Sequence, residues 1–471
     1  MRILLSLFFS LNTLILTAQV KKYTLEECVL LALEKNISIK QSELDLEGAE
    51  IDKADAIGNF LPRINAQSQH IWNNGLSQNI TNGLIENLTT QFSSFGGNLG
   101  ITLFGGKQNS NQLARANLNL IARQYQLDDM KDDISLFVAN TYLQVMFNKE
   151  FEQVQRYQLE LANQELEQTK VRIEAGVQTQ ADIYEIEANV AAQEQALLQA
   201  ENSTRLSLIS LAQTLLITDY ESFDIAEVNY DIPLSQILLE QPKKIFEKAL
   251  TFRNDIKLAA TNVEIAKKDI DLAKGALLPT LSAFYNYNTR ISYSDRFVET
   301  GNVIETPIGV VKESGAIVLS QFPEREIAGP LSFADQFKQN DGMSYGLSLN
   351  IPIFNGLSAK NNIKRRRLNL KRSETFFEQN KLDLENTINQ AYTSATAAFK
   401  FYEASEKTLK AREQAYMMAE QQFELGVLNS YDFIQIKQRY EIAASDRVRA
   451  KYDYIFKLKI LEFYFGQEIT L

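Results

Sequence analysis

The sequence predicts a mainly α-helical protein that is internally duplicated and carries β-strands of the kind found in membranes. Only 8 prolines and 20 glycines occur among 471 residues, and this composition favours long helices because few residues break them. Two blocks of sequence occur twice in the same order, with stretches of alternating apolar and polar residues between the helical patterns of each copy. One pattern of helices and strands is therefore expected to be present twice.

The first residues have the pattern of a secretory signal peptide. Arg2 is followed by an apolar run from Ile3 to Leu16, and Ala18 offers a small residue near a cleavage point. The run is too short for a membrane anchor, the alternative interpretation, so residues 1–19 are predicted to be a signal for export. No later stretch of about 18 apolar residues follows that could form a transmembrane helix. Cys28 is the only cysteine and is expected to be a buried, inert thiol.

Charge and motif content argue against several classes of function. The formal net charge of −11 disfavours nucleic-acid binding, which requires clustered Lys and Arg. One basic cluster, Lys364–Arg367, lies in a helical pattern and is interpreted as a solvated or subunit-facing surface. The chain has no metal-spaced His, Cys and Glu, no nucleophile motif and no glycine-rich phosphate loop. We therefore expect neither an enzyme nor a cofactor.

The duplication is visible in two blocks. Ala49–Pro62 recurs 217 positions later as Ala266–Pro279. A second block, Phe104–Leu211, recurs 250 positions later as Phe354–Leu461 without a gap, so the second copy has an excess of 33 residues before Phe354. We expect this excess in a loop at about 297–339. The predicted organisation is a signal peptide (1–19), a first repeat (20–216), a connector (217–242), a second repeat (243–466) and a tail (467–471).

Each repeat begins with a helical pattern that ends at Leu-Pro, over Thr24 to about Phe60 and about Lys244 to Leu277. The next stretches alternate between apolar and Asn, Ser or Gln residues, which predicts strands with one apolar face. Such strands of about ten residues are typical of an outer-membrane wall, and a soluble sandwich with one buried face is the alternative. The predicted strands are Arg63–Trp72, Phe95–Phe104, Leu281–Tyr293 and Ser344–Phe354.

Four strands cannot close a membrane wall, because open edges are not tolerated in lipid. Other copies must supply the remaining strands. Two copies would give about eight strands, whose interior side chains fill, whereas three or four copies would leave a lumen.

The longest helices are predicted over Lys107–Glu174 and Leu357–Glu424, which contain no proline. Each would measure about 100 Å at the rise of an α-helix. The helices that follow have apolar residues at alternating spacings of three and four, for example from Ile183 to Thr204. The long helices carry a second stripe, so a closed wall of neighbouring coiled coils is expected.

Two glycine turns connect these helices. Gly176 and Gly426 follow helix C-termini, where glycine adopts the left-handed conformation most easily. Asp182 and Asp432 follow near the next helix N-terminus, where a carboxylate is stabilised by the helix dipole. Capping explains both aspartates, and a position at the opening of a duct is the functional alternative.

These motifs together resemble the TolC-like outer-membrane efflux protein family. The resemblance rests on the paired Leu-Pro endings, on the strand exits Leu103–Gly106 and Ile353–Gly356, and on the turns Gly176–Ile183 and Gly426–Phe433. It implies a homotrimer with a 12-stranded β-barrel in the outer membrane, continued by a long α-helical barrel in the periplasm. Its implied role is the passive exit duct of a tripartite efflux or type I secretion system. The implied partners are outer-membrane lipid, a periplasmic adaptor (membrane fusion) protein and an inner-membrane transporter.

The resemblance also assigns site residues. The adaptor-docking turns would contain Gly176, Val177, Gly426, Val427 and Leu428, and the periplasmic mouth would contain Asp182 and Asp432.

Two positions depart from the family pattern. Some relatives have an arginine where Leu428 stands and an acidic residue where Gln435 stands, which puts a salt-bridged gate and a doubled acidic ring in doubt. A periplasmic adaptor or coiled-coil scaffold remains the alternative function, although such proteins usually carry one hairpin.

Overall fold

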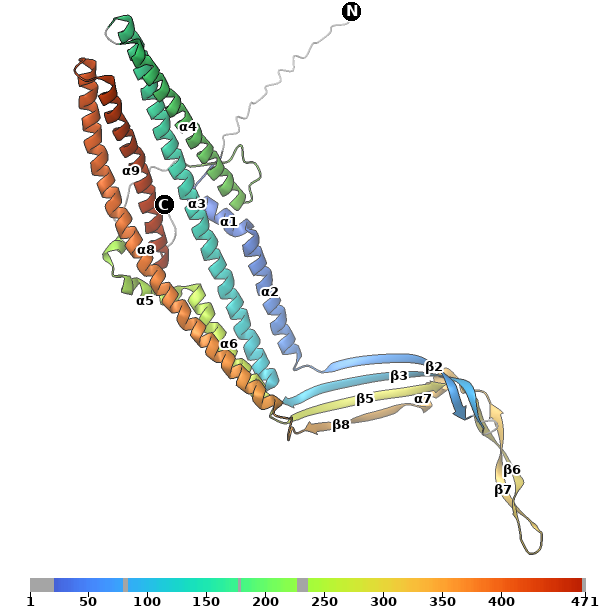
Figure 1. Ribbon diagram of the computed structural model, residues 1–471. Coiled ribbons are helices and arrows are strands. Elements are labelled where there is room, and N and C mark those ends of the chain that lie inside the picture. Colours follow the sequence, from blue (N-terminus) through green and yellow to red (C-terminus); the bar gives the residue numbers. More distant parts are fainter. Residues whose placement is uncertain (1–20, 79–83, 177–178, 227–235, 468–471) are drawn as a thin grey trace, which may run out of the picture. The chain divides into compact units, whose positions relative to one another are not determined.

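The computed structural model describes residues 21–78, 84–176, 179–226 and 236–467 (Figure 1). The chain forms two compact units. The helical unit comprises the described residues up to Glu50, Leu118–Glu264 and Lys371 onwards, and the strand-bearing unit comprises Ile51–Asn117 and Ile265–Leu370. The predicted signal peptide and most of the predicted tail lie outside the described residues.

The helices of the two halves have matching lengths. Helices α1 and α5 have 11 residues each, α2 and α6 have 22, α3 and α8 have 67, and α4 and α9 have 35. The predicted duplication is confirmed, because each pair starts at the offset found in the sequence. The first set is α1 (Leu25–Lys35), α2 (Ile37–Gly58), α3 (Gln108–Glu174) and α4 (Gln180–Thr214), and the second is α5 (Pro242–Phe252), α6 (Asn254–Gly275), α8 (Ser358–Glu424) and α9 (Ser430–Tyr464).

The prediction of one continuous helix at the start of each repeat was wrong. The backbone leaves the helical conformation at Asn36 and at Arg253, where ψ is 132° and 127°. Local hydrogen bonds explain both breaks, since the Asn36 side chain accepts from the Ser38 amide and the Asp255 side chain from the Ile256 amide. Side chains of this type compete with the helical hydrogen bonds of the backbone.

The strand-bearing unit contains a four-stranded antiparallel sheet in the order β2-β3-β5-β8 (Figure 1). All four strands lie where alternation predicted them, but β2 and β3 are longer than predicted, and β8 ends earlier. The register places apolar residues of neighbouring strands opposite each other, as in Leu281 with Leu349 and Ala283 with Leu347. The strands are β2 (Arg63–Gln78), β3 (Ile85–Gly105), β5 (Thr280–Ser292) and β8 (Gly342–Asn350).

The apolar face of the sheet is uncovered at β8, whereas the segment 333–339 covers its other end, at Thr289 and Ile291. Tyr345, Leu347 and Leu349 of β8 are 79%, 68% and 61% exposed. The residues that alternate with them are Ser344, Gly346, Ser348 and Asn350. One face of the sheet is therefore apolar and the other is polar, as the alternation predicted.

The extra residues of the second half form ordered structure between β5 and β8. Strands β6 (Arg296–Val310) and β7 (Ile317–Ala328) form an antiparallel ribbon, and the short helix α7 (Phe333–Gln339) follows. Helix α7 packs on the sheet, where the Thr289 hydroxyl donates to the Phe337 carbonyl at 3.0 Å. The sequence analysis did not predict these elements.

The helical unit has two equivalent cores. In the first, Tyr142 is fully buried and its hydroxyl donates to the carbonyls of Tyr23 and Ala226. In the second, the equivalent Tyr392 donates to the Leu238 carbonyl at 3.0 Å. These bonds tie the long helices to the short elements around the connector, which are β1 (Lys22–Tyr23), β4 (Asp224–Ile225) and the 3₁₀ helix η1 (Gln236–Leu239).

Cys28 is fully buried in the first core, as predicted, and burial raises the pKa of its thiol to about 12. The thiol is therefore protonated and unreactive at neutral pH. Within the described residues, no helix has an apolar stretch long enough to cross a membrane.

Candidate functional site at the helix turns

The candidate site comprises the turns that join α3 to α4 and α8 to α9. Gly176 and Gly426 have φ values of 72° and 71°, in the left-handed region that favours glycine. The Val427 amide donates to the Gln422 carbonyl at 2.9 Å, which satisfies a carbonyl at the end of α8. The glycines therefore end the long helices, as predicted. Val177 lies outside the described residues.

Both predicted mouth aspartates lie in the first turn of a helix and bond to its N-cap residue, Thr179 for Asp182 and Asn429 for Asp432. The Asp182 carboxylate accepts from the Thr179 amide and from the Thr179 hydroxyl, both at 2.9 Å. The Asp432 carboxylate accepts from the Asn429 side-chain amide at 2.8 Å, and the Asp432 amide donates to the Asn429 side chain at 2.9 Å. Each aspartate thus has a structural role, which leaves the role at a mouth as a proposal.

The α8–α9 turn presents apolar side chains to solvent. Leu425, Val427 and Tyr431 are 78%, 76% and 68% exposed. Leu428 is half-buried against a small cluster formed by Ala419, Phe423 and Phe433. The two predicted docking residues therefore differ, because Val427 is available at the surface and Leu428 mainly packs within the hairpin.

An aromatic stack supports this turn. The rings of Phe423 and Phe433 are parallel, with centroids 4.5 Å apart, and join α8 to α9. The guanidinium of Arg172, from α3, lies 4.5 Å from the centre of the Phe423 ring. Such a cation–π contact stabilises by about 0.5–2 kcal/mol, depending on how far it is shielded from water. Arg172 therefore connects the ends of the two hairpins.

Farther along the hairpins lies a buried charge cluster that the sequence analysis missed. The Lys437 ammonium, on α9, is 2.6 Å from the Glu165 carboxylate on α3, and their side chains are 2% and 7% exposed. Glu441, one helical turn beyond Lys437, is also buried. The Gln193 side chain donates to its carboxylate at 3.3 Å. One lysine therefore lies among two buried carboxylates.

This arrangement makes the helical unit sensitive to pH. The pKa of Glu441 is raised from 4.5 to about 7, chiefly by burial; Lys437 opposes this rise and nearby Glu165 adds to it. Between pH 4.5 and about 7 the Glu441 carboxyl keeps its proton in the folded protein and has lost it in the unfolded chain. The free energy of unfolding therefore falls as pH rises. We expect a loss on the order of 3 kcal/mol across this window.

Thermal unfolding followed by circular dichroism from pH 4 to 8 measures this effect. The Glu441→Gln variant should remove the decline, because glutamine has no proton to lose. The Glu185→Gln variant, at an exposed position on α4, should keep it. An unchanged decline in Glu441→Gln would show that other groups cause it.

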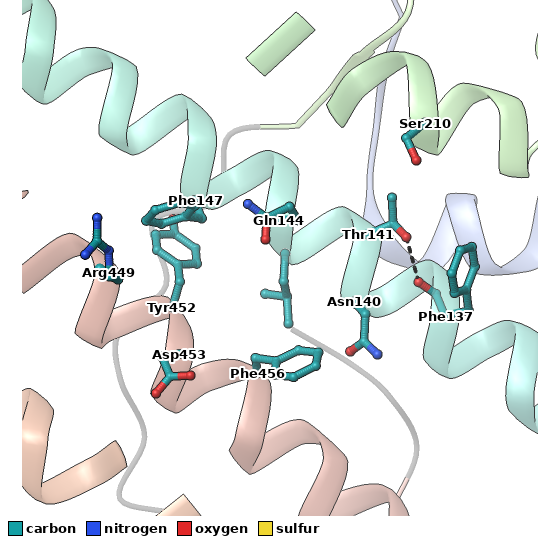
Figure 2. Close-up of a pocket in the computed structure, with 11 residues that line it drawn as sticks. Phe137, Asn140, Thr141, Gln144, Phe147, Ser210, Arg449, Tyr452, Asp453 and Phe456 are labelled. Carbon is teal, nitrogen blue, oxygen red and sulfur yellow. Dashed lines mark hydrogen bonds between the residues drawn. The ribbon is translucent and has the colours of Figure 1, made fainter. Parts of the chain in front are cut away.

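A separate groove of about 550 Å³ lies between α3, α4 and α9 (Figure 2). Its walls carry the rings of Phe137, Phe147, Tyr452 and Phe456. The Oδ1 atom of Asn140, also in its lining, is buried and has no hydrogen-bond partner in the described chain. None of the predicted site residues lines this groove.

The described residues contain no cluster of His, Cys, Asp and Glu placed to hold a metal ion. The geometry instead consists of two long helical hairpins, with apolar residues exposed at the α8–α9 turn, and a sheet whose apolar face is exposed at β8. This duplicated combination defines a class of outer-membrane efflux proteins. The chain belongs to that family: the family model for outer membrane efflux proteins matches residues 29–215 and 245–467, which cover both repeats.

Comparison with known proteins agrees with this assignment. The chain is 28% identical over 182 residues to the pyoverdine export outer membrane protein OpmQ of Pseudomonas aeruginosa, covering 39% of this chain and 37% of that protein. It is 22% identical over 330 residues to the outer membrane protein TolC of Vibrio cholerae, covering 69% of this chain and 65% of the relative. In both cases the match spans less than two thirds of the relative's length.

The fold is also that of solved outer-membrane proteins. The crystal structure of VceC from Vibrio cholerae aligns with a TM-score of 0.72 at 14% identity, covering 95% of this chain and 97% of that one. The CmeC outer membrane channel of Campylobacter jejuni aligns with a TM-score of 0.70 at 16% identity, covering 94% and 85%. At this identity the likeness establishes the fold.

Proposed function

We propose that this protein is the exit duct of a tripartite efflux or type I secretion system and conducts substrates passively out of the cell. The observation that carries the proposal is the two-faced sheet joined to duplicated long hairpins in one chain. A sheet that is apolar on one side and polar on the other suits lipid outside and water inside. Long helices with two partner faces suit a wall around a continuing duct.

The sheet supports a ring of several copies. Its edge strands β2 and β8 each have one unpaired edge in the described chain, and such edges are not tolerated in lipid. Three copies would provide 12 strands from the four-stranded sheet, enough for a wall with a lumen. A homotrimer is therefore the proposed assembly.

The hairpin turns are the proposed docking site for a periplasmic adaptor. Exposed Leu425, Val427 and Tyr431 support this role, because apolar residues clustered at the surface mark contact sites. The adaptor would connect the duct to an inner-membrane transporter. Leu428 contributes mainly by packing the turn.

Asp182 and Asp432, which bond to the N-cap residues of α4 and α9, are proposed to lie at the periplasmic mouth. Replacing both with alanine removes these hydrogen bonds and should lower helix stability by about 1 kcal/mol each. If they also ring the mouth, cation selectivity and block by divalent cations should weaken in planar bilayers. The Asp219→Asn variant, at a surface turn of the connector, is the control. Unchanged selectivity in the double variant would leave only the structural role.

The extra segment of the second half is proposed to lie outside the cell. Exposed Ile304, Ile308 and Ile317 lie on the β6–β7 ribbon, which a protease can reach only if it faces the medium. Proteolysis of intact cells should cut at about 297–339 and spare the helices. Protection of this segment in intact cells would contradict the placement.

Cell fractionation tests the proposed function against the adaptor alternative. We expect the protein in the outer-membrane fraction, extracted by detergent as an oligomer. A monodisperse monomer in detergent-free buffer would overturn the duct.

A further inference from the structure

Because the chain is duplicated, a contact between two residues of the first repeat has an equivalent contact between the matching residues of the second. Moving the pair Arg63–Gly100, which joins β2 to β3, by 217 and 250 positions gives Thr280–Asn350. That pair is found between β5 and β8. The same holds along the whole of the β5–β8 pairing. One observed interface therefore predicts the residues of its duplicate.

Some contacts join a residue of the first repeat to a residue of the second. Shifting such a pair by the repeat offsets gives two residues that are not in contact within the described sheet. Strand β3 pairs with β5, and the duplicate pair is β8 with β2, the two edge strands. The equivalent of Leu99–Tyr285 would be Leu349–Ser68. Contacts between α3 and α6 likewise have their duplicates between α8 and α2. Contacts between α3 and α9 have theirs between α8 and α4. A second copy of the chain can supply these partners.

The first such duplicate is an ion pair. Within the strand-bearing unit, the Arg115 Nε donates to the Asp269 carboxylate at 2.6 Å. The equivalent residues are Arg365, in the basic cluster of α8, and Asp52 on α2. Both are exposed, and neither has an ion-pair partner among the described residues. Opposite charges thus stand at the two equivalent positions.

The second duplicate is apolar. The Asn254 side chain donates to the Asp132 carboxylate at 2.9 Å. The equivalent residues are Ile37 and Leu382, which are 59% and 60% exposed. Both members of a polar pair are thus aliphatic in the duplicate, which keeps the contact favourable once water is excluded.

The third duplicate reverses the charges. The Lys451 ammonium lies 2.8 Å from the Glu150 carboxylate. The equivalent residues are Glu201, half-buried beside Arg156, and Lys400, which is exposed. An acid faces a base in both cases, although each position has changed sign.

The fourth duplicate is a close approach of backbones. A Cβ on Gly106 would lie 2.5 Å from the Gly275 carbonyl oxygen, so only glycine fits there. The equivalents Gly356 and Gly58 have no heavy atom within 4 Å of such a Cβ. The φ of 63° favours glycine at Gly356 in the single chain, whereas Gly58 has no positive φ and no neighbour that requires glycine.

We propose that a second copy of this chain docks its α2 and α4 against α8, with contacts that duplicate those between the two halves. Arg365 pairs with Asp52, Leu382 packs on Ile37, and Lys400 pairs with Glu201. These contacts define the surface through which neighbouring copies meet. Only the closure of the ring around a duct rests on the proposed function.

Cysteine cross-linking tests the docking. The native Cys28 is fully buried, so it does not compete for the reagent. Chains with Asp52→Cys and chains with Arg365→Cys, each with its own tag, are produced together and treated in membranes with a bifunctional thiol cross-linker, because a direct disulfide requires Cα atoms closer than an Arg–Asp pair places them. We expect a cross-linked species that carries both tags. Arg367→Cys replaces Arg365→Cys as the control, because a position two residues along a helix faces another direction.

Single-channel recording of the same preparation separates the two claims. Channels of unchanged conductance without the mixed-tag species would overturn the docking and leave the proposed duct. A mixed-tag species without any conductance would support the docking and overturn the duct.

A charge exchange provides an independent test. Asp52→Arg and Arg365→Asp should each lower the temperature at which the oligomer dissociates in detergent, and the double variant should restore it. Circular dichroism confirms that each variant is folded. A double variant no more stable than either single one would contradict the pair.

Discussion

Replacing Lys437 with methionine is expected to destabilise the helical unit by about 3–5 kcal/mol, the cost of breaking one partner of a buried ion pair. The ammonium lies 2.6 Å from the Glu165 carboxylate, and both side chains are almost fully buried. The variant leaves Glu165 charged without its counterion, and its Oε1 atom already lacks a hydrogen-bond partner. Chemical denaturation followed by circular dichroism measures the loss.

Two controls identify the cause of this loss. The Lys437→Met, Glu165→Leu double variant should regain most of the stability, because apolar residues replace both charges. The Lys170→Met variant removes an ion pair with Glu167 at 2.7 Å that is largely exposed, and should cost less than about 1 kcal/mol. If Lys437→Met costs no more than Lys170→Met, the buried pair does not stabilise the hairpins.

Replacing Gly106 with alanine is expected to have the second largest effect. Its φ of 61° is left-handed, which costs an alanine about 1–2 kcal/mol. The new Cβ would also lie 2.5 Å from the Gly275 carbonyl oxygen, a backbone atom that cannot rotate away. Overpacking of this kind adds about 1–3 kcal/mol. The thermal unfolding temperature of the detergent-extracted protein measures the sum.

Two other glycines separate the two contributions. Gly426→Ala has the same backbone strain, with φ of 71°, but no neighbouring atom within 4 Å, so it should cost only the strain. Gly356→Ala should match Gly426→Ala in folding and differ in assembly, if a second copy approaches it. An effect of Gly106→Ala no larger than that of Gly426→Ala would contradict the close approach.

Local sequence features predicted most of the fold. Prolines after Leu61 and Leu278 mark the end of the first helical pattern in each repeat. Gly176 and Gly426 mark the ends of α3 and α8, whose bounds were predicted to within one residue. The alternation of Tyr and Asn over β5 likewise predicted a strand with two different faces. The internal repeat strengthened each prediction, because every element had to be present twice.

Features that depend on distant residues were not predictable in this way. Glu165 and Lys437 are 272 positions apart, and only the packing of α3 on α9 brings their charges together. The breaks at Asn36 and Arg253 depend on side-chain hydrogen bonds at single positions, which helical periodicity does not report. In the turns, the sequence identified Asp182 and Asp432, but the half-buried position of Leu428 follows from its packing on Phe423 and Phe433.

Single-channel recording of the purified protein in planar lipid bilayers tests the central claim most directly. We expect stepwise conductance from the detergent-extracted oligomer without any energy source, because a passive duct needs none. The Asp182→Ala, Asp432→Ala variant should still conduct, with altered ion selectivity. Folded, membrane-inserted oligomers that show no conductance steps would contradict the proposed exit duct.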